Sequence, residues 1–147
     1  MTPTDLTRRP PRSPREELDG LCMLPRMIDI ARAKLPGGDV GQYQIGRGMS
    51  GLVLSAFGLS AERFVEMVRD AGTDADVAAA LGRRVAVARR AVGARLGRVT
   101  VADVPADLKE SFQQFYGADL PSDRLVFDVL EADDREMFPD HPTIQPG

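Results

Sequence analysis

Glycine, proline and helix-capping residues divide this chain into short segments, within which the apolar residues recur at the spacing of an α-helix. Ser13-Pro14-Arg15-Glu16 predicts a first short helix, since serine can cap it, proline suits its first position and glutamate completes a capping box. Gly20 would end that helix. A second helix is predicted from Leu24-Pro25 to Leu35, and the run Pro36-Gly37-Gly38 would end it.

Further helices are predicted along the rest of the chain. An apolar helix of about two turns is expected near residues 52–57. Ser60 and Thr73 are placed to cap the next two helices. Residues 83–98 give the clearest amphipathic pattern, with Leu81, Val85, Ala88, Val92 and Leu96 on its apolar side. Two more are predicted after Pro105, with Leu108, Phe112 and Phe115 facing inward, and around Leu125, Val126, Val129 and Leu130.

These signals favour an all-α fold. Leu, Ile, Val and Phe make up 37 of the 147 residues, about a quarter, which exceeds the roughly 20% below which chains tend to be disordered. We find no pair of strong strand runs joined by a hairpin signal. We therefore predict a compact single-domain bundle of about six to eight short helices over residues 13–138, with a flexible extended N-terminal arm over 1–12 and a C-terminal tail over 139–147.

Composition also bears on location. The single cysteine excludes an intrachain disulfide and fits a reducing compartment. No apolar run approaches the ~18 residues of a membrane-spanning helix, and the basic N-terminus is not followed by the apolar stretch of a signal peptide. We expect a cytoplasmic protein without membrane association.

The net charge of −3 hides a strong asymmetry along the chain. Residues 77–102 carry six arginines and no acidic residue, whereas residues 103–147 carry eleven acidic and three basic residues. The basic face could bind a polyanion, or it could pair with the acidic third of a second copy and form a homodimer. Nucleic acid is the less favoured partner, because the chain is acidic overall and no aromatic residues alternate with the arginines. The arginines that we assign to this face are Arg83, Arg84, Arg90, Arg95 and Arg98.

Residues 46–51 match the G-x-G-x-x-G pattern of dinucleotide-binding loops. A dinucleotide site needs a buried strand before this loop, but the preceding segment is short and half polar. It also needs an acidic residue at the end of a second strand, and Asp70 instead belongs to a predicted helix. A true dinucleotide site is therefore disfavoured. A small anion could still bind at this helix start, beside Arg47 and Ser50.

The remaining reactive residues give no catalytic set. Ser50 lacks the second glycine of a nucleophile elbow, and the only histidine, His141, lies in a proline-flanked tail. Cys22 is expected to be packed and inert. The acidic run over residues 131–136 is expected to be a solvated helix end, because it lacks the spacing of a calcium loop. We predict no catalytic residue, no metal and no cofactor.

The segment PRSPREELDGLCMLPRMIDIARAKLPGGDVGQY, residues 11–43, resembles the bacterial family known as domain of unknown function 5069. Members open with a PRSPRE-like run and an LPRM-D-ARA-like run, followed by G-x-Y. The likeness extends over about residues 5–80 and implies no activity. Two departures are Ile30, where many members carry a basic residue, and residues 46–49, Gly-Arg-Gly-Met, in place of a Cys-Pro type run.

The arginines of this motif are not explained by capping or apolar packing. Arg26 falls in a first helical turn, where the helix dipole disfavours a cation, so we expect either a carboxylate partner such as Glu16, Glu17 or Asp29, or a bound anion. Three functions are compatible with these features: a non-enzymatic binding or interaction module, which we favour; a small-molecule or anion-binding protein or enzyme with a pocket near Arg26 and residues 43–50; and a nucleic-acid backbone binder. The candidate ligand-binding residues are Arg15, Arg26, Tyr43, Arg47 and Ser50.

Overall fold

The computed structural model describes residues 4–141, and the fold over these residues is mostly helical. A two-stranded hairpin, β1 and β2, precedes the helices. The elements are β1 (Glu17–Leu18), β2 (Leu21–Cys22), α1 (Leu24–Ala33), α2 (Gly48–Phe57), α3 (Ala61–Ala71), α4 (Asp74–Leu81), α5 (Arg83–Ala88), the π-helix η1 (Arg89–Gly93), α6 (Ala94–Leu96), the 3₁₀ helix η2 (Val101–Asp103), α7 (Ala106–Tyr116) and α8 (Val126–Met137). Within residues 4–141, no helix is long and apolar enough to cross a membrane.

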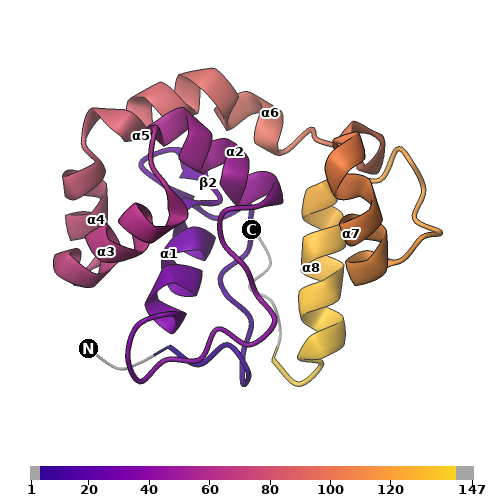
Figure 1. Ribbon diagram of the computed structural model, residues 1–147, viewed down its shortest axis with the longest axis horizontal. Helices are drawn as coiled ribbons and strands as arrows, with labels where there is room; N and C mark the ends of the chain where they lie inside the picture. The colour runs from indigo at the N-terminus through magenta and orange to yellow at the C-terminus, as the bar shows by residue number, and fades with distance from the viewer. Residues whose placement is uncertain (1–3, 142–147) are drawn as a thin grey trace.

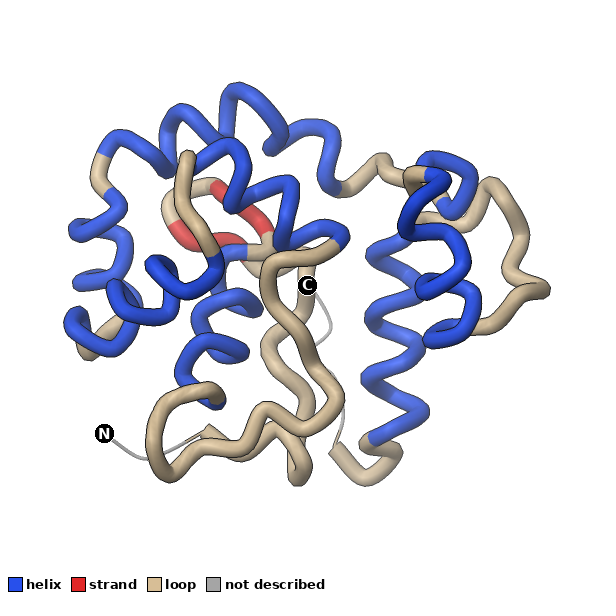
Figure 2. The backbone as a smooth tube through the Cα atoms, viewed as in Figure 1, coloured by secondary structure: helices blue, strands red, loops and turns tan. Residues whose placement is uncertain are grey.

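The helices form a larger body and a smaller pair (Figure 1). In the body, α3 and α4 lie on one side of α1, while α5, η1 and α6 arch over α2. Helices α7 and α8 lie together on the other side, and the loop over residues 37–47 runs between α1 and α8 (Figure 2). One buried hydrophobic cluster extends from the hairpin to α8, and its largest members include Leu24, Phe57, Phe64 and Phe127.

Several local predictions are confirmed. Helix α1 starts at Leu24 with proline in its first turn and ends at Ala33, close to the predicted stop. The hydroxyl groups of Ser60 and Thr73 accept hydrogen bonds from the backbone amides three residues later, at the starts of α3 and α4.

The helix predicted from Ser13 to Gly20 is wrong. Asp19 and Gly20 both have positive φ, 51° and 78°, and they connect β1 to β2 with Leu18 paired to Leu21. Positive φ at both central residues is the requirement of a type I′ turn, which Asp-Gly satisfies well. The hairpin signal was therefore present in the sequence, and the strands are too short to give the alternation by which strands are recognised.

The amphipathic segment over residues 83–98 is helical but interrupted. Val85, Ala88 and Leu96 are buried as predicted. The π-helix η1 separates α5 from α6, and the extra residue of a π turn rotates the later side chains relative to those of a continuous α-helix. Arg95 and Arg98 follow the π turn and line a cavity. The other arginines of the basic face lie before or within the π turn and do not line that cavity; they are Arg83, Arg84 and Arg90.

Helix α7 departs from its predicted inner face, because none of its residues is buried. Leu108 and Phe112 are half-buried, and Phe115 is 46% exposed. All three line the same cavity as Arg95 and Arg98, which explains why they look core-like in the sequence and are not covered.

The described part of the N-terminal arm, residues 4–12, contains no helix. It packs on the body all the same, because Leu6 is 1% exposed and clusters with Ile30 and Ala33. The backbone of Leu6 donates a hydrogen bond to the Asp39 carbonyl at 2.8 Å. The flexibility predicted for this arm stays a prediction.

Candidate ligand-binding site

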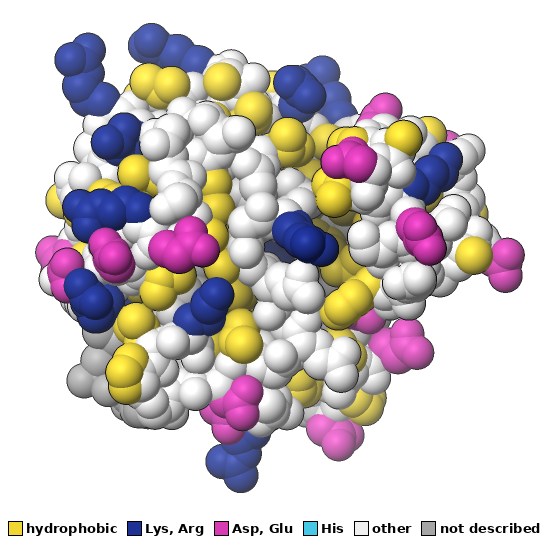
Figure 3. All heavy atoms as spheres, in the orientation of Figure 1, with side chains coloured by type: hydrophobic (Ala, Val, Ile, Leu, Met, Phe, Trp, Pro, Cys, Tyr) yellow, Lys and Arg dark blue, Asp and Glu magenta, His cyan; other side chains and the backbone are white. Residues whose placement is uncertain are grey.

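A cavity of about 820 Å³ lies between the helical body and the α7–α8 pair. In the space-filling view the surface is hollowed between these two parts, with hydrophobic side chains and a basic side chain inside the hollow (Figure 3). Its walls come from the start of α1, residues 42–52, residues 95–105, and the facing sides of α7 and α8. Pockets of roughly 300–1,000 Å³ are the size that holds cofactors and drug-sized molecules.

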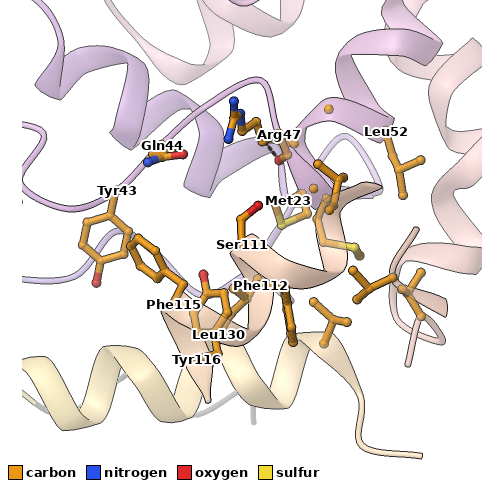
Figure 4. A pocket seen from close by; sticks show the side chains of 18 of the residues that line it. Met23, Tyr43, Gln44, Arg47, Leu52, Ser111, Phe112, Phe115, Tyr116 and Leu130 are labelled. Carbon is orange, nitrogen blue, oxygen red and sulfur yellow. Dashed lines mark hydrogen bonds between the residues drawn. The ribbon is translucent and has the colours of Figure 1, made fainter. Parts of the chain in front are cut away.

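Helices α7 and α8 supply the apolar wall of this cavity. Phe112, Phe115 and Tyr116 of α7 lie next to Leu130 of α8, and Met23 approaches from the body (Figure 4). The Phe112 and Tyr116 rings stand 4.9 Å apart between centroids. Aromatic and aliphatic side chains in a concave site favour an apolar ligand, since burying its surface removes that surface from water.

Three arginines lie on the wall nearest α2 and α6. They are Arg47, just before α2, and Arg95 and Arg98, at the end of the basic face. Each is exposed, and among residues 4–141 none of them forms a salt bridge. Figure 4 shows Arg47 at the edge of the cavity, across from Tyr116 and Leu130.

Ser50 also lines the cavity, but its hydroxyl group is already engaged. Its Oγ donates to the Arg47 carbonyl at 2.9 Å and accepts from the Gly46 amide at 3.0 Å, and the residue is 4% exposed. These bonds hold the turn that leads into α2. Ser50 therefore shapes the loop rather than presenting a free nucleophile. No strand precedes this turn among residues 40–46, although a dinucleotide-binding loop would need one.

Arg26 meets a carboxylate that the sequence did not suggest. Its guanidinium donates to both carboxylate oxygens of Asp134 on α8, at 2.8 and 3.1 Å, and both side chains are almost fully buried. The Tyr43 hydroxyl donates to the same carboxylate at 2.8 Å, and the Arg26 guanidinium lies 5.4 Å from the Tyr43 ring centroid. The expectation of a carboxylate partner is thus confirmed, but the examples given for it, Glu16, Glu17 and Asp29, are wrong. Arg26 and Tyr43 border the cavity as a neutralised, hydrogen-bonded group.

Arg15 lies away from the cavity and joins the hairpin region to α8. It forms salt bridges with Asp128, at 2.6 Å, and with Glu131. Glu131 also accepts a hydrogen bond from the Ser13 hydroxyl at 3.1 Å. The interpretation of residues 131–136 as a solvated helix end is therefore wrong for Glu131 and Asp134, which are 6% and 1% exposed. The signal was the three-residue spacing of the acids at 128, 131 and 134, which places them along one side of a helix.

A further arginine of the motif, Arg12, joins the N-terminal segment to α1 and α4. It forms salt bridges with Asp29, at 3.0 Å, and with Asp74, at 2.7 Å. Arg32 adds a second salt bridge to Asp74 at 3.0 Å. The hydrogen bond from Arg12 is the main reason that the pKa of Asp74 is lowered. The motif arginines thus form salt bridges that join distant parts of the chain.

Two cavity residues have raised pKa values because burial disfavours their charged forms. Burial raises the pKa of Asp133, with the neighbouring charges of Asp134 and Glu136 acting in the same direction. Burial likewise raises the pKa of Tyr116 to about 12, and the Asp133 charge adds to it. Sequence reasoning missed Tyr116, which belongs to no motif, and considered Asp133 only as part of the acidic run over residues 131–136.

The remaining candidates lie elsewhere. Arg84 donates to the Phe57 carbonyl at 3.1 Å, while Arg83 and Arg90 are exposed outside the cavity. Cys22 is half-buried in β2, and burial raises its pKa. His141 is exposed after α8. Among residues 4–141, no three His, Cys, Asp or Glu side chains are grouped as metal ligands.

The family model described as Domain of unknown function (DUF5069) matches residues 8–136, a region that contains the motif arginines and their acidic partners on α8. The chain belongs to this family. The resemblance carried by residues 11–43 is thereby confirmed, and the DUF5069 match takes in α7 and α8 as well. No curated protein matches the chain. Membership of DUF5069 assigns no activity.

Proposed function

We propose that this protein binds a small, mainly apolar molecule in the cavity between the helical body and the α7–α8 pair. The observation that carries the proposal is the cavity of about 820 Å³ with its apolar wall of Phe112, Phe115, Tyr116 and Leu130. A volume of this size would bury most of a drug-sized molecule. The single cysteine supports a cytoplasmic setting.

The polar residues around the cavity support binding rather than catalysis. The Ser50 hydroxyl is used within its own loop. The Asp134 carboxylate is held by Arg26 and Tyr43, so it offers no free base. These groups instead keep the walls in place, as a preorganised binding site requires. The proposal agrees with a non-enzymatic binding module and specifies a small molecule as the ligand.

The test uses N-phenyl-1-naphthylamine, a neutral aromatic probe whose fluorescence rises in apolar surroundings. We expect saturable binding at micromolar concentrations. Leu108→Trp, which places a bulkier side chain on the cavity wall, should weaken this binding about tenfold or more, because an overfilled pocket excludes an apolar body of the probe's size. The matched control is Val87→Trp, since Val87 is 52% exposed on α5 and lies outside the cavity. Equal affinity in the wild type and both variants would refute the proposal.

A second candidate is binding to a nucleic-acid backbone. It is supported by the six arginines of residues 77–102, which have no acidic neighbour in that segment. Phosphate neutralisation by this face would be salt-dependent and independent of sequence. Retention of the wild type on duplex DNA, lost at high salt and in the variant with Arg83→Glu and Arg90→Glu, would support it. The absence of any retention at low salt would eliminate it.

A further inference from the structure

We propose that the ligand of this cavity is an amphiphilic anion, whose acidic group is held by Arg47, Arg95 and Arg98 while its apolar body lies against α7 and α8. The inference rests on the proposed function and specifies the class of ligand. A carboxylate or phosphate is the group that guanidinium side chains bind best, because both can accept two parallel hydrogen bonds.

The first support is the contrast among the arginines. The buried cavity arginine, Arg26, is neutralised by Asp134. Within residues 4–141, salt bridges also engage the arginines at positions 12, 15, 32, 63 and 69. Arg47, Arg95 and Arg98 line the cavity and have no salt bridge in this described part of the chain. Positive charge is therefore left over on this wall.

The second support is the position of the acidic groups around the cavity. Asp103 accepts hydrogen bonds from the amide and hydroxyl groups of Thr100, at 2.9 and 3.0 Å, and so serves the start of η2. These hydrogen bonds are the main reason that the pKa of Asp103 is lowered, and the nearby Arg95 charge acts in the same direction. Asp133 lies on α8, on the opposite side of the cavity from Arg47. Among the described lining residues, the side toward α2 and α6 thus carries three arginines and one acidic residue, Asp103, while the α8 side carries Asp133.

The third support comes from the way α2 begins. This ten-residue helix has no side-chain cap, no acidic residue in its first turn, and Arg47 immediately before it. Unpaired amides at a helix start carry partial positive charge, which adds to the field of the arginines. An anion at this wall would accept hydrogen bonds from the amides and neutralise the arginines, while a neutral ligand would leave the charge of the arginines unpaired.

The experiment compares two fluorescent probes that share an aromatic body. 1-Anilinonaphthalene-8-sulfonate carries a negative charge, and N-phenyl-1-naphthylamine is its neutral counterpart. We expect the wild type to bind the sulfonate about tenfold more tightly, the size of effect that a charge-assisted hydrogen bond produces. Arg47→Gln should remove most of this advantage and leave the affinity for the neutral probe unchanged. Arg47 is exposed, so its replacement should not disturb folding.

The matched control is Arg90→Gln, which removes the same charge from an exposed residue outside the cavity. It should leave both affinities unchanged. Equal affinities of the wild type for the two probes, or equal losses of sulfonate binding in the Arg47 and Arg90 variants, would overturn the inference while the binding of the neutral probe upholds the proposed function. If neither probe binds the wild type, both the inference and the proposed function fail.

Discussion

The buried ion pair between Arg26 and Asp134 allows a sharp prediction about stability. Asp134→Asn keeps the size of the side chain but removes the charge that the Arg26 guanidinium faces at 2.8 and 3.1 Å. Both side chains are at most 5% exposed, so water cannot replace the lost carboxylate. Breaking one partner of such a pair typically costs about 3–5 kcal/mol. Asparagine can still accept from Tyr43, which favours the lower end, about 3 kcal/mol.

For a chain of this length, about 3 kcal/mol corresponds to a fall of roughly 10 °C in Tm. Urea unfolding followed by circular dichroism gives the free energy directly. The double variant with Arg26→Met and Asp134→Leu should be less destabilised than the sum of its single changes, because it leaves no unpaired charge behind. Asp70→Asn is the control, since Asp70 forms an exposed salt bridge with Arg69 and should leave the urea midpoint unchanged. Unfolding of the Asp134→Asn variant at the wild-type midpoint would show that the buried ion pair does not stabilise the fold.

Three other properties of the chain can be measured with equal directness. The pKa of Asp74 is lowered by Arg12, so its contribution to stability is present above its ordinary pKa of about 3.9 and is lost as pH falls through the lower folded-state value. Asp74→Asn should thus be less stable than the wild type at pH 6, and the difference should shrink in urea titrations below about pH 4; a constant difference would contradict this. Cys22 is half-buried and burial raises its pKa, so it should react slowly with Ellman's reagent in the native protein and fast in guanidinium. Equal rates in the native and the unfolded protein would show that the native thiol is reactive. The chain should sediment as a homodimer at micromolar concentration, and a single species of about 16 kDa at every loading would eliminate the dimer.

Features that depend on neighbouring residues were predictable. The capping hydroxyls of Ser60 and Thr73 act within three residues of themselves, and the Leu24-Pro25 start of α1 is equally local. Ser13 also accepts a hydrogen bond locally, from the Arg15 amide at 3.1 Å, but no helix follows it, and its hydroxyl donates to Glu131, 118 residues away. The local pattern of a capping residue gives no sign of the distant carboxylate to which its hydroxyl donates.

The candidate site was predictable in part. The sequence led to Arg26, Tyr43, Arg47 and Ser50, and all four border one cavity. The opposite wall could not be predicted, because an amphipathic helix that lines a cavity has the same apolar spacing as one that packs on a core. Phe115 has the spacing of a core residue, and its 46% exposure on the cavity wall is seen only in the folded structure.

The pairing of Arg26 with Asp134 also constrains when this protein can fold. The two residues are 108 positions apart, and synthesis proceeds at about 5–20 residues per second. On a ribosome, Arg26 therefore emerges several seconds before the carboxylate that neutralises it, and a nascent chain ending before α8 holds an arginine that cannot be buried without a partner. The helical body should reach its final packing only after α8 has been made, and the emergence of α8 from the ribosome is then the step that commits it.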